Sequence, residues 1–132
     1  MAISHIKAVF QADAQTVWDT VTSLDDCAWR SDVSRIAVVS ETQFIEYTKE
    51  GFATTFTVTA REPCARWEFD MENDNMKGHW TGVFTREGEQ TAIDFTEDVT
   101  AKKLLLKPFV KAYLKKQQAR YVADLRKALL DR

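Results

Sequence analysis

The sequence is poor in the residues on which several classes of protein depend. Its two cysteines, Cys27 and Cys64, are too few and too far apart for a disulfide scaffold or a CxxC redox motif, so we expect reduced, structural thiols. Its two histidines, His5 and His79, form neither an HxH nor an HExxH pattern, and no metal site is predicted. Walker, GxGxxG and GxSxG motifs and a plausible Ser-His-Asp set are also lacking, so we expect no cofactor.

Long apolar runs are missing as well. None approaches the roughly 18 to 20 residues that cross a bilayer, and the N-terminal stretch MAISHIKAVF lacks the pattern of a secretory signal. These absences predict a cytoplasmic protein without stable membrane insertion. A length of 132 residues, 45% of them apolar and 29% charged, fits one globular domain over 1–132.

Charge is distributed unevenly along the chain. From Thr100 onward there are ten Lys or Arg against two Asp, whereas the preceding part holds eight basic and 18 acidic residues. Opposite signs predict that the C-terminal segment docks on its own domain. Its lysines spread round the polar face of a helix without exposed aromatic residues between them, which indicates a solvated face and neither a nucleic acid nor an anionic membrane as partner.

The order of predicted elements is strand, helix, meander, helix. A strand at 4–12 is followed by a helix at 12–24, for which Asp13 can serve as N-cap, and then by a short helical turn or loop at 25–32. Six β-rich segments separated by turn residues predict an antiparallel meander; they are 34–40, 43–49, 52–62, 65–73, 78–87 and 90–101.

A long amphipathic helix closes the chain. It is expected from about Lys103, with a regular part from Lys107, because Pro108 is tolerated only in a first turn or as a kink. The predicted inner stripe recurs near the 3.6-residue period and consists of Leu106, Val110, Tyr113, Gln117, Tyr121, Leu125 and Leu129. This α+β pattern requires the helix to cover the apolar face of the sheet.

The sequence resembles the START-like, or SRPBCC, helix-grip superfamily, which includes polyketide cyclase and dehydrase-like proteins, lipid-transfer domains and plant allergen-like carriers. The resemblance rests on VWDTVTSLDDCAWRSDVSRI, FTVTAREPCARWEFDMEN, GHWTGVF and TAIDFTEDV, followed by the final helix. It implies a curved antiparallel sheet of about seven strands wrapped around the C-terminal helix, with one or two short helices after the first strand. It also implies an apolar cavity between the helix and the sheet.

Aromatic side chains dominate the strand faces assigned to this cavity, which also include Phe52, with Gly78 and Gly82 allowing bends or close approaches. Alternatively, the aromatic residues fill a dry core outright. Candidate ligand-binding residues are Trp29, Phe56, Trp67, Phe69, Met71, Trp80, Phe84, Phe95, Glu97, Tyr113 and Gln117.

Glu97 is the misfit on this apolar face, since it shares one side of its strand with Phe95 and Val99. A buried carboxyl without a cationic partner should have a raised pKa. Three interpretations remain open: a ligand-facing acid or anchor, a structural latch to Gln117 or Tyr113, or a position open to solvent. Glu46 is a second candidate for an inward carboxyl if Phe44 rather than Ile45 faces inward.

Further candidates lie on the loop WRSD and on the outer strand face. Resemblance places Trp29, Arg30 and Asp32 near a cavity mouth; alternatively, Trp29 plugs the core while the other two form a surface pair. Trp18 is assigned to the core. A solvated strand face and turn is expected for Asp70, Glu72 and Asp74.

The leading functional prediction is binding of a small hydrophobic ligand: a lipid, a polyketide-like molecule or an aromatic compound. The alternatives are a cyclase- or dehydratase-like enzyme, in which Glu97 exchanges a proton and Tyr113 polarises an oxygen, and an interaction module like the chaperone-activating relatives. Catalytic residues, beyond the candidates Glu97 and Tyr113, and oligomeric state stay open.

Overall fold

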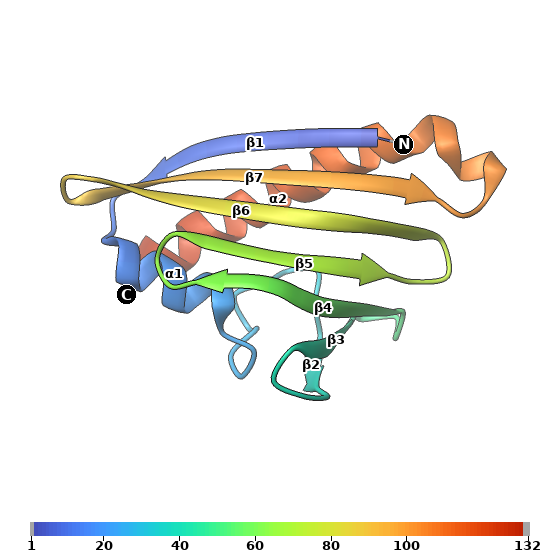
Figure 1. Cartoon of the computed structure of the whole chain (residues 1–132), viewed down its shortest axis with the longest axis horizontal. Helices are drawn as coiled ribbons and strands as arrows, with labels where there is room; N and C mark the ends of the chain where they lie inside the picture. The colour runs from blue at the N-terminus through green and yellow to red at the C-terminus, as the bar shows by residue number, and fades with distance from the viewer. Residues whose placement is uncertain (1, 131–132) are drawn as a thin grey trace.

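Strands form where aromatic and β-branched residues alternate with polar ones. The computed structural model describes residues 2–130 and contains a seven-stranded antiparallel sheet (Figure 1). The strands are β1 (Ala2–Phe10), β2 (Arg35–Val38), β3 (Gln43–Tyr47), β4 (Ala53–Glu62), β5 (Arg66–Glu72), β6 (Met76–Glu87) and β7 (Gln90–Ala101).

The sheet order is β1-β7-β6-β5-β4-β3-β2, so β2 to β7 form the predicted meander. Only β1 pairs out of sequence order: it lies antiparallel to β7, with Ser4 opposite Glu97. On its other side β7 pairs with β6, which places Trp80 opposite Glu97. The row that crosses these three strands therefore carries Glu97 at its centre.

Helix α1 (Ala14–Thr22) starts where predicted. The Asp13 carboxylate accepts a hydrogen bond from the Thr16 amide at 2.8 Å, which satisfies one of the free amides of the first turn. Its Trp18 is buried, as expected, and packs edge-on against Phe84 with ring centroids 5.2 Å apart. Segment 25–32 is a loop, and both cysteines are free and partly buried.

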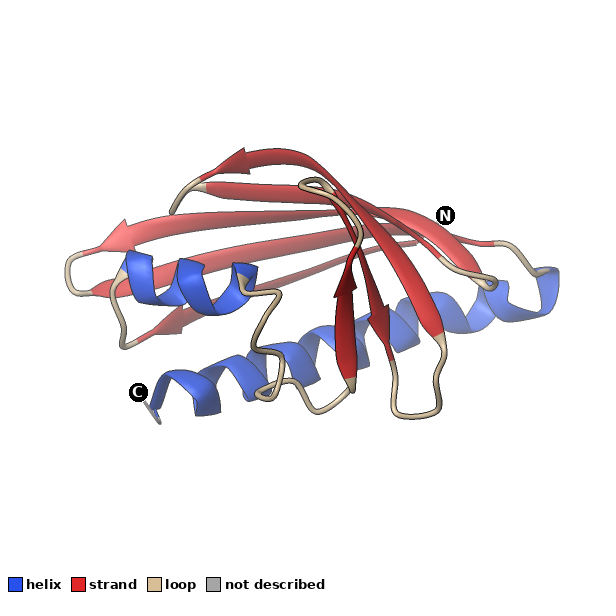
Figure 2. Ribbon diagram, turned by 90° about the horizontal axis from the view of Figure 1, so that it is seen from below, coloured by secondary structure: helices blue, strands red, loops and turns tan. Residues whose placement is uncertain are grey.

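The closing segment divides into a 3₁₀ helix η1 (Leu104–Phe109) and helix α2 (Val110–Leu130). The regular helix begins at Val110 rather than Lys107, because Pro108 has no amide hydrogen to donate and its ring obstructs the preceding turn. In Figure 2 the sheet curves over α2, while α1 and η1 lie near opposite ends of the molecule. This is the helix-grip arrangement that the sequence predicts.

The buried stripe of α2 differs from the predicted one. It consists of Val110, Leu114, Gln118, Val122 and Leu125, whereas Tyr113 is 48% exposed. Sequence periodicity placed the stripe one residue too early along the middle of the helix, because the polar Gln118 did not register as a core residue. The tyrosines Tyr113 and Tyr121 instead lie on the flank that faces the cavity.

Gln118 fastens α2 to the sheet. Its Oε1 accepts a 2.7 Å hydrogen bond from the Ser4 hydroxyl, and its Nε2 donates to the Ser4 carbonyl at 3.0 Å. Both residues are buried. Since a buried polar group is tolerated when its hydrogen bonds are made, this pair fixes the position of the helix over β1 and β7.

Candidate functional site

A cavity of about 180 Å³ lies between the concave face of the sheet, α2 and the loop after α1. Ten of the eleven predicted ligand-binding residues line it: Trp29, Phe56, Trp67, Phe69, Met71, Trp80, Phe95, Glu97, Tyr113 and Gln117. Seven of these residues lie on β4 to β7, and strand alternation placed their side chains on the face that lines the cavity.

Phe84 is the exception, and its assignment to the cavity is wrong. It shares the inward face with Trp80, but it lies further along β6, where α1 covers the sheet, and its ring is enclosed by Trp18 and Phe95. Phe52, assigned to the inward face, precedes β4 and is 38% exposed, although it borders the cavity. Side-chain alternation along a strand predicts which face of the sheet a residue lies on. It does not predict which helix covers that residue.

The aromatic residues of the wall pack against one another. Phe69 and Trp80 stack with centroids 4.8 Å apart, and Phe44 stacks on Phe56 at 5.0 Å. The ring of Trp80 also covers Gly82, where a Cβ atom would collide with the indole. Both sequence interpretations thus hold in part: an aromatic core follows the sheet, and a cavity remains beside it.

Glu97 faces this cavity from β7. Among the described residues its carboxyl has no hydrogen-bond partner within the usual distance. Burial raises the pKa of Glu97 from 4.5 to about 7, with Arg30 opposing the shift and Glu46 reinforcing it. At neutral pH the carboxyl is therefore partly protonated and can either donate or accept a hydrogen bond.

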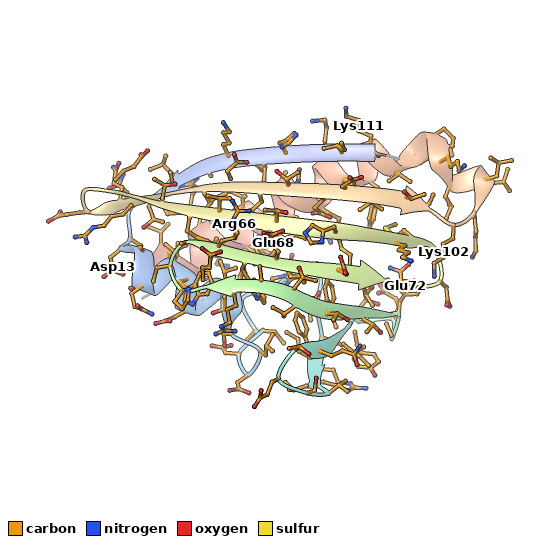
Figure 3. All side chains as sticks on the ribbon, in the orientation of Figure 1. Asp13, Arg66, Glu68, Glu72, Lys102 and Lys111 are labelled. Atoms are coloured by element: carbon orange, nitrogen blue, oxygen red, sulfur yellow. The ribbon has the colours of Figure 1, made fainter. Side chains whose placement is uncertain are left out.

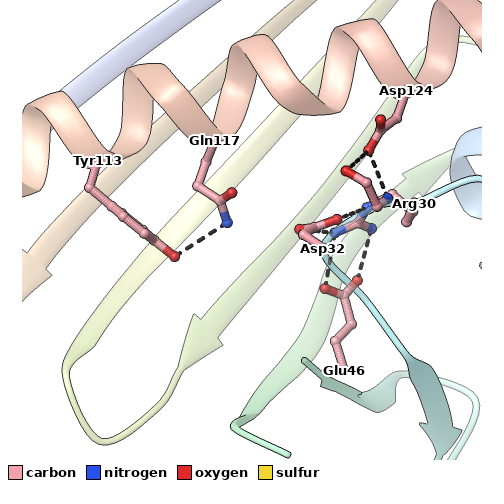
Figure 4. A network of polar contacts seen from close by, with 7 residues as sticks. Arg30, Asp32, Glu46, Tyr113, Gln117 and Asp124 are labelled. Carbon is pink, nitrogen blue, oxygen red and sulfur yellow. Dashed lines mark hydrogen bonds and ion pairs between the residues drawn. The ribbon is translucent and has the colours of Figure 1, made fainter. Parts of the chain in front are cut away.

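The proposed latch between Glu97 and the final helix is not present. Gln117 Nε2 instead donates to Tyr113 Oη at 3.2 Å, and these two side chains form a pair of their own (Figure 4). Burial, together with Glu97 and Asp32, raises the pKa of Tyr113, and its hydroxyl stays protonated. Gln118, which was not among the residues predicted from the sequence, holds the final helix on the sheet instead.

Arg30 also lines the cavity, in contact with two carboxylates (Figure 4). Its Nε and Nη2 atoms donate to Asp32, both at 3.0 Å, and Nη1 and Nη2 donate to Glu46 at 3.2 and 3.3 Å. The Arg30 side chain is 12% exposed, so the expectation of a surface pair is wrong. The loop turns inward because the guanidinium also covers the Tyr121 ring, 4.9 Å from its centroid.

These contacts determine the ionisation of the cluster. Burial alone would lower the pKa of Arg30, but Glu46 and Asp32 together raise it. Burial would raise the pKa of Asp32, but the hydrogen bond from Arg30 lowers it. Four of the five guanidinium N–H donors are thus engaged by the two carboxylates.

The sequence could indicate that Glu46 faces inward, but not that it binds Arg30. The alternation of β3 offered Glu46 as an inward residue if Phe44 faces the core, and Phe44 is buried. Nothing local links Glu46 to Arg30, 16 residues earlier in the chain. Trp29, which packs edge-on against Tyr121, lines the cavity and also closes the core, so both interpretations of that residue apply.

The outer face of the sheet is solvated, as expected: Asp70, Glu72 and Asp74 are exposed, and several charges on this face are also paired. His79 points away from the cavity, as predicted, with Nδ1 2.7 Å from Asp70 and Nε2 2.8 Å from Glu68. Figure 3 shows Glu68 beside Arg66, and Glu72 beside Lys102, whose ammonium is 2.7 Å from the Glu72 carboxylate. Within 2–130 no group of three or more His, Cys, Asp or Glu side chains is arranged to hold a metal ion.

The arrangement of a curved sheet around a long helix matches known structures closely. A START superfamily protein from Mycobacterium smegmatis superposes with a TM-score of 0.91 at 12% identity, covering 99% of both chains. A protein from Thermus thermophilus gives 0.78 at 17% identity, covering 98% of this chain and 97% of the other. The di-domain ARO/CYC protein BexL from the BE-7585A biosynthetic pathway gives 0.81 at 12% identity, covering 96% of this chain and 46% of that one.

These likenesses establish a START-like helix-grip fold, as the sequence resemblance implied. A family model described as polyketide cyclase / dehydrase and lipid transport matches residues 1–130, and the chain belongs to that family. No curated protein matches the sequence. None of the helices in 2–130 has the length and hydropathy needed to span a bilayer.

Proposed function

We propose that the protein binds a small hydrophobic molecule in the cavity, with one polar atom of the ligand held by Glu97. The observation that carries this proposal is an inward carboxyl without a protein partner in a wall of aromatic rings. Ligand sites typically combine a mostly apolar lining with a few polar groups that fix orientation. Glu97, Tyr113 and Gln117 are such groups, and membership of the family supports the same class of function.

The cavity volume limits the ligand. Since a cavity of about 150 Å³ can accommodate benzene, 180 Å³ fits a molecule on the order of one ring. A longer ligand would extend past Tyr113, which lines the cavity and is half exposed. Binding of a larger polyketide-like or lipid molecule would therefore require side chains at this end to move.

The charges favour a neutral ligand that carries a hydrogen-bond acceptor. The cavity wall holds four acidic residues, Asp32, Glu46, Glu72 and Glu97, against the single cation Arg30, which already binds Asp32 and Glu46. An anionic ligand would face net negative charge in a low-dielectric site. The protonated form of Glu97 can instead donate to a carbonyl or hydroxyl oxygen.

A cyclase- or dehydratase-like reaction is the second candidate, and the pKa of Glu97 near 7 favours it. A group that titrates near the working pH can both give and accept a proton. Tyr113, still protonated and lining the same cavity, could polarise a substrate oxygen. In this case Glu97→Gln would abolish turnover of a substrate that still binds.

Three single-ring probes test the proposal: acetophenone, ethylbenzene and benzoate, followed by ligand-observed NMR and tryptophan emission. We expect acetophenone to bind most tightly and benzoate least. Glu97→Met should weaken the binding of acetophenone by roughly tenfold, because one hydrogen bond is lost, while the binding of ethylbenzene is unchanged. Asp98→Asn, which changes the neighbouring outward carboxyl of β7, is the matched control and should change nothing. Failure of all three probes to bind would contradict the proposed function, whereas equal binding of benzoate would contradict the polarity.

A further inference from the structure

The start of the closing segment exposes large apolar side chains. Leu104, Leu105 and Phe109 of η1 are 77%, 84% and 66% exposed, and Tyr113 of α2 is 48% exposed. We call these four residues the apolar tip. Only Leu106 in η1 turns inward, where it packs against the small core cluster around Val99 and Leu114. Contiguous exposed apolar side chains of this kind indicate an interaction site.

Lysines follow the apolar residues along the same segment. Lys107, Lys111, Lys115 and Lys116 are exposed, and no acidic residue occurs between Asp98 and Asp124. Figure 3 shows Lys111 beside the tip end of α2. Lys102 and Lys103 instead bind Glu72 and Asn75, which anchors the segment to the turn between β5 and β6. The sequence-based expectation that no exposed aromatic residues lie among these lysines is therefore wrong, because Phe109 and Tyr113 do.

We propose that the apolar tip docks the protein on the surface of an anionic lipid bilayer. Exposed Leu and Phe side chains with lysines nearby in the same segment are the combination that binds at such interfaces, where the apolar groups enter the acyl boundary and the ammonium groups meet anionic headgroups. The segment is too short and too charged to cross the membrane, so the mode is peripheral.

A bilayer fits this surface better than another protein does. In Figure 2 η1 lies at one end of the molecule, below and beyond the strands. An exposed tip can enter a soft apolar phase without a complementary surface. A second copy of the chain would bring the same lysines to the interface, and like charges there disfavour pairing.

Docking would also orient the cavity. Tyr113 belongs both to the apolar tip and to the cavity wall, so this end of the cavity would lie at the membrane surface. The docking proposal stands on exposure and charge alone, and it holds whether or not the cavity binds the ligand class proposed above.

Co-sedimentation of the full chain with vesicles, without any added ligand, tests the proposal. We expect binding to vesicles of phosphatidylcholine and phosphatidylserine that exceeds binding to phosphatidylcholine alone by at least about tenfold and that falls at high salt. Leu104→Ser with Leu105→Ser, and separately Lys107→Glu with Lys111→Glu, should each reduce it by about tenfold or more. Phe109→Ser is a third, independent variant of the apolar tip.

Matched controls change the same residue types elsewhere. Val38→Ser with Val39→Ser alters two side chains that are 56% and 55% exposed on and after the edge strand β2. Lys7→Glu with Lys77→Glu makes the same charge change on other exposed lysines. Both controls should bind vesicles like the unmodified chain, and thermal melts verify that every variant is folded.

Three results would overturn the proposal. One is equal sedimentation with and without phosphatidylserine, or none with either. Another is a loss of binding in the controls as large as in the tip variants, or a loss confined to the lysine variants. The third is a dimer that dissociates when Leu104 and Leu105 are changed, which would assign the apolar tip to a second copy of the chain.

Discussion

Glu46 and Glu97 line the same cavity but differ in their partners. Glu46, on β3, accepts two hydrogen bonds from Arg30, which the loop after α1 brings to that side. Glu97, on β7, has no such partner in the described chain, and its pKa rises to about 7. A carboxyl that is inward and paired is a structural element, whereas one that is inward and unpaired is available to a ligand or a proton.

On the outer face of the sheet, His79 is also paired with two carboxylates, but these pairs are more exposed to solvent than the Arg30 cluster. His79 lies opposite Asp98 and directly precedes the inward Trp80 on β6, so its side chain points outward. Its two carboxylate partners are solvent-accessible to different degrees, and its own side chain is 38% exposed. Pairing is therefore similar to that at Arg30, but solvent screening makes the interaction much weaker.

The largest expected effect comes from removing the paired cation. Arg30→Met should lower the free energy of unfolding by about 3 to 5 kcal/mol, because Asp32 and Glu46 would remain partly buried without a counter-charge. It should also raise the pKa of Glu97 further, since Arg30 opposes that shift. Urea denaturation and carboxyl-resolved NMR titration measure the two effects.

The triple variant Arg30→Met, Asp32→Asn, Glu46→Gln is the control for that prediction. It should regain most of the lost stability, because no uncompensated charge remains. An Arg30→Met protein that unfolds at the same urea concentration as the unmodified chain would show that the cluster has no structural role.

Glu97→Gln should have a smaller effect of opposite sign. The folded-state pKa lies above the unfolded value of 4.5, so the unfolded chain releases its proton first and stability falls as pH rises from about 4.5 to about 7. The variant lacks this loss, and above pH 7 it should be more stable than the unmodified protein by up to about 3 kcal/mol. Below pH 4.5 the two should unfold alike.

Denaturation curves at several pH values measure this difference. Asp98→Asn, on the outward side of the same strand, serves as the matched control. If Glu97→Gln is less stable than the unmodified chain at every pH, the carboxyl makes a stabilising contact and the contrast with Glu46 fails.

His79→Gln should have the smallest effect, below about 1 kcal/mol, because the ion pairs are exposed. Burial lowers the pKa of His79, but Asp70 and Glu68 outweigh it and raise the pKa above 6.5. The contribution is complete below pH 6.5 and disappears as pH rises through the raised value. His5→Gln, on the same face, is the control, and equal effects of the two changes would remove any special role for the His79 pairs.

Much of the fold and half of the site chemistry could be predicted from the sequence. Strand alternation located β4 to β7 almost to the residue and placed Phe95 and Glu97 on the same inward face. It could not place Phe84 outside the cavity, because the position of α1 over the sheet has no local signature. Nor could helical periodicity identify Gln118, whose burial depends on a hydrogen bond to Ser4, 114 residues away.

The sequence by itself determined that a carboxyl at position 97 points inward, because side-chain alternation along a strand is a local property of the backbone. Only the tertiary structure decided that this carboxyl stays unpaired. The loop that carries Arg30 packs its guanidinium on Tyr121, and its hydrogen bonds are directed to Glu46 and Asp32 and not to Glu97. Tertiary packing likewise left Leu104, Leu105 and Phe109 at the surface, while Leu106 of the same turn packs against the core. Pairing and exposure depend on which distant segments meet, and no local periodicity encodes that.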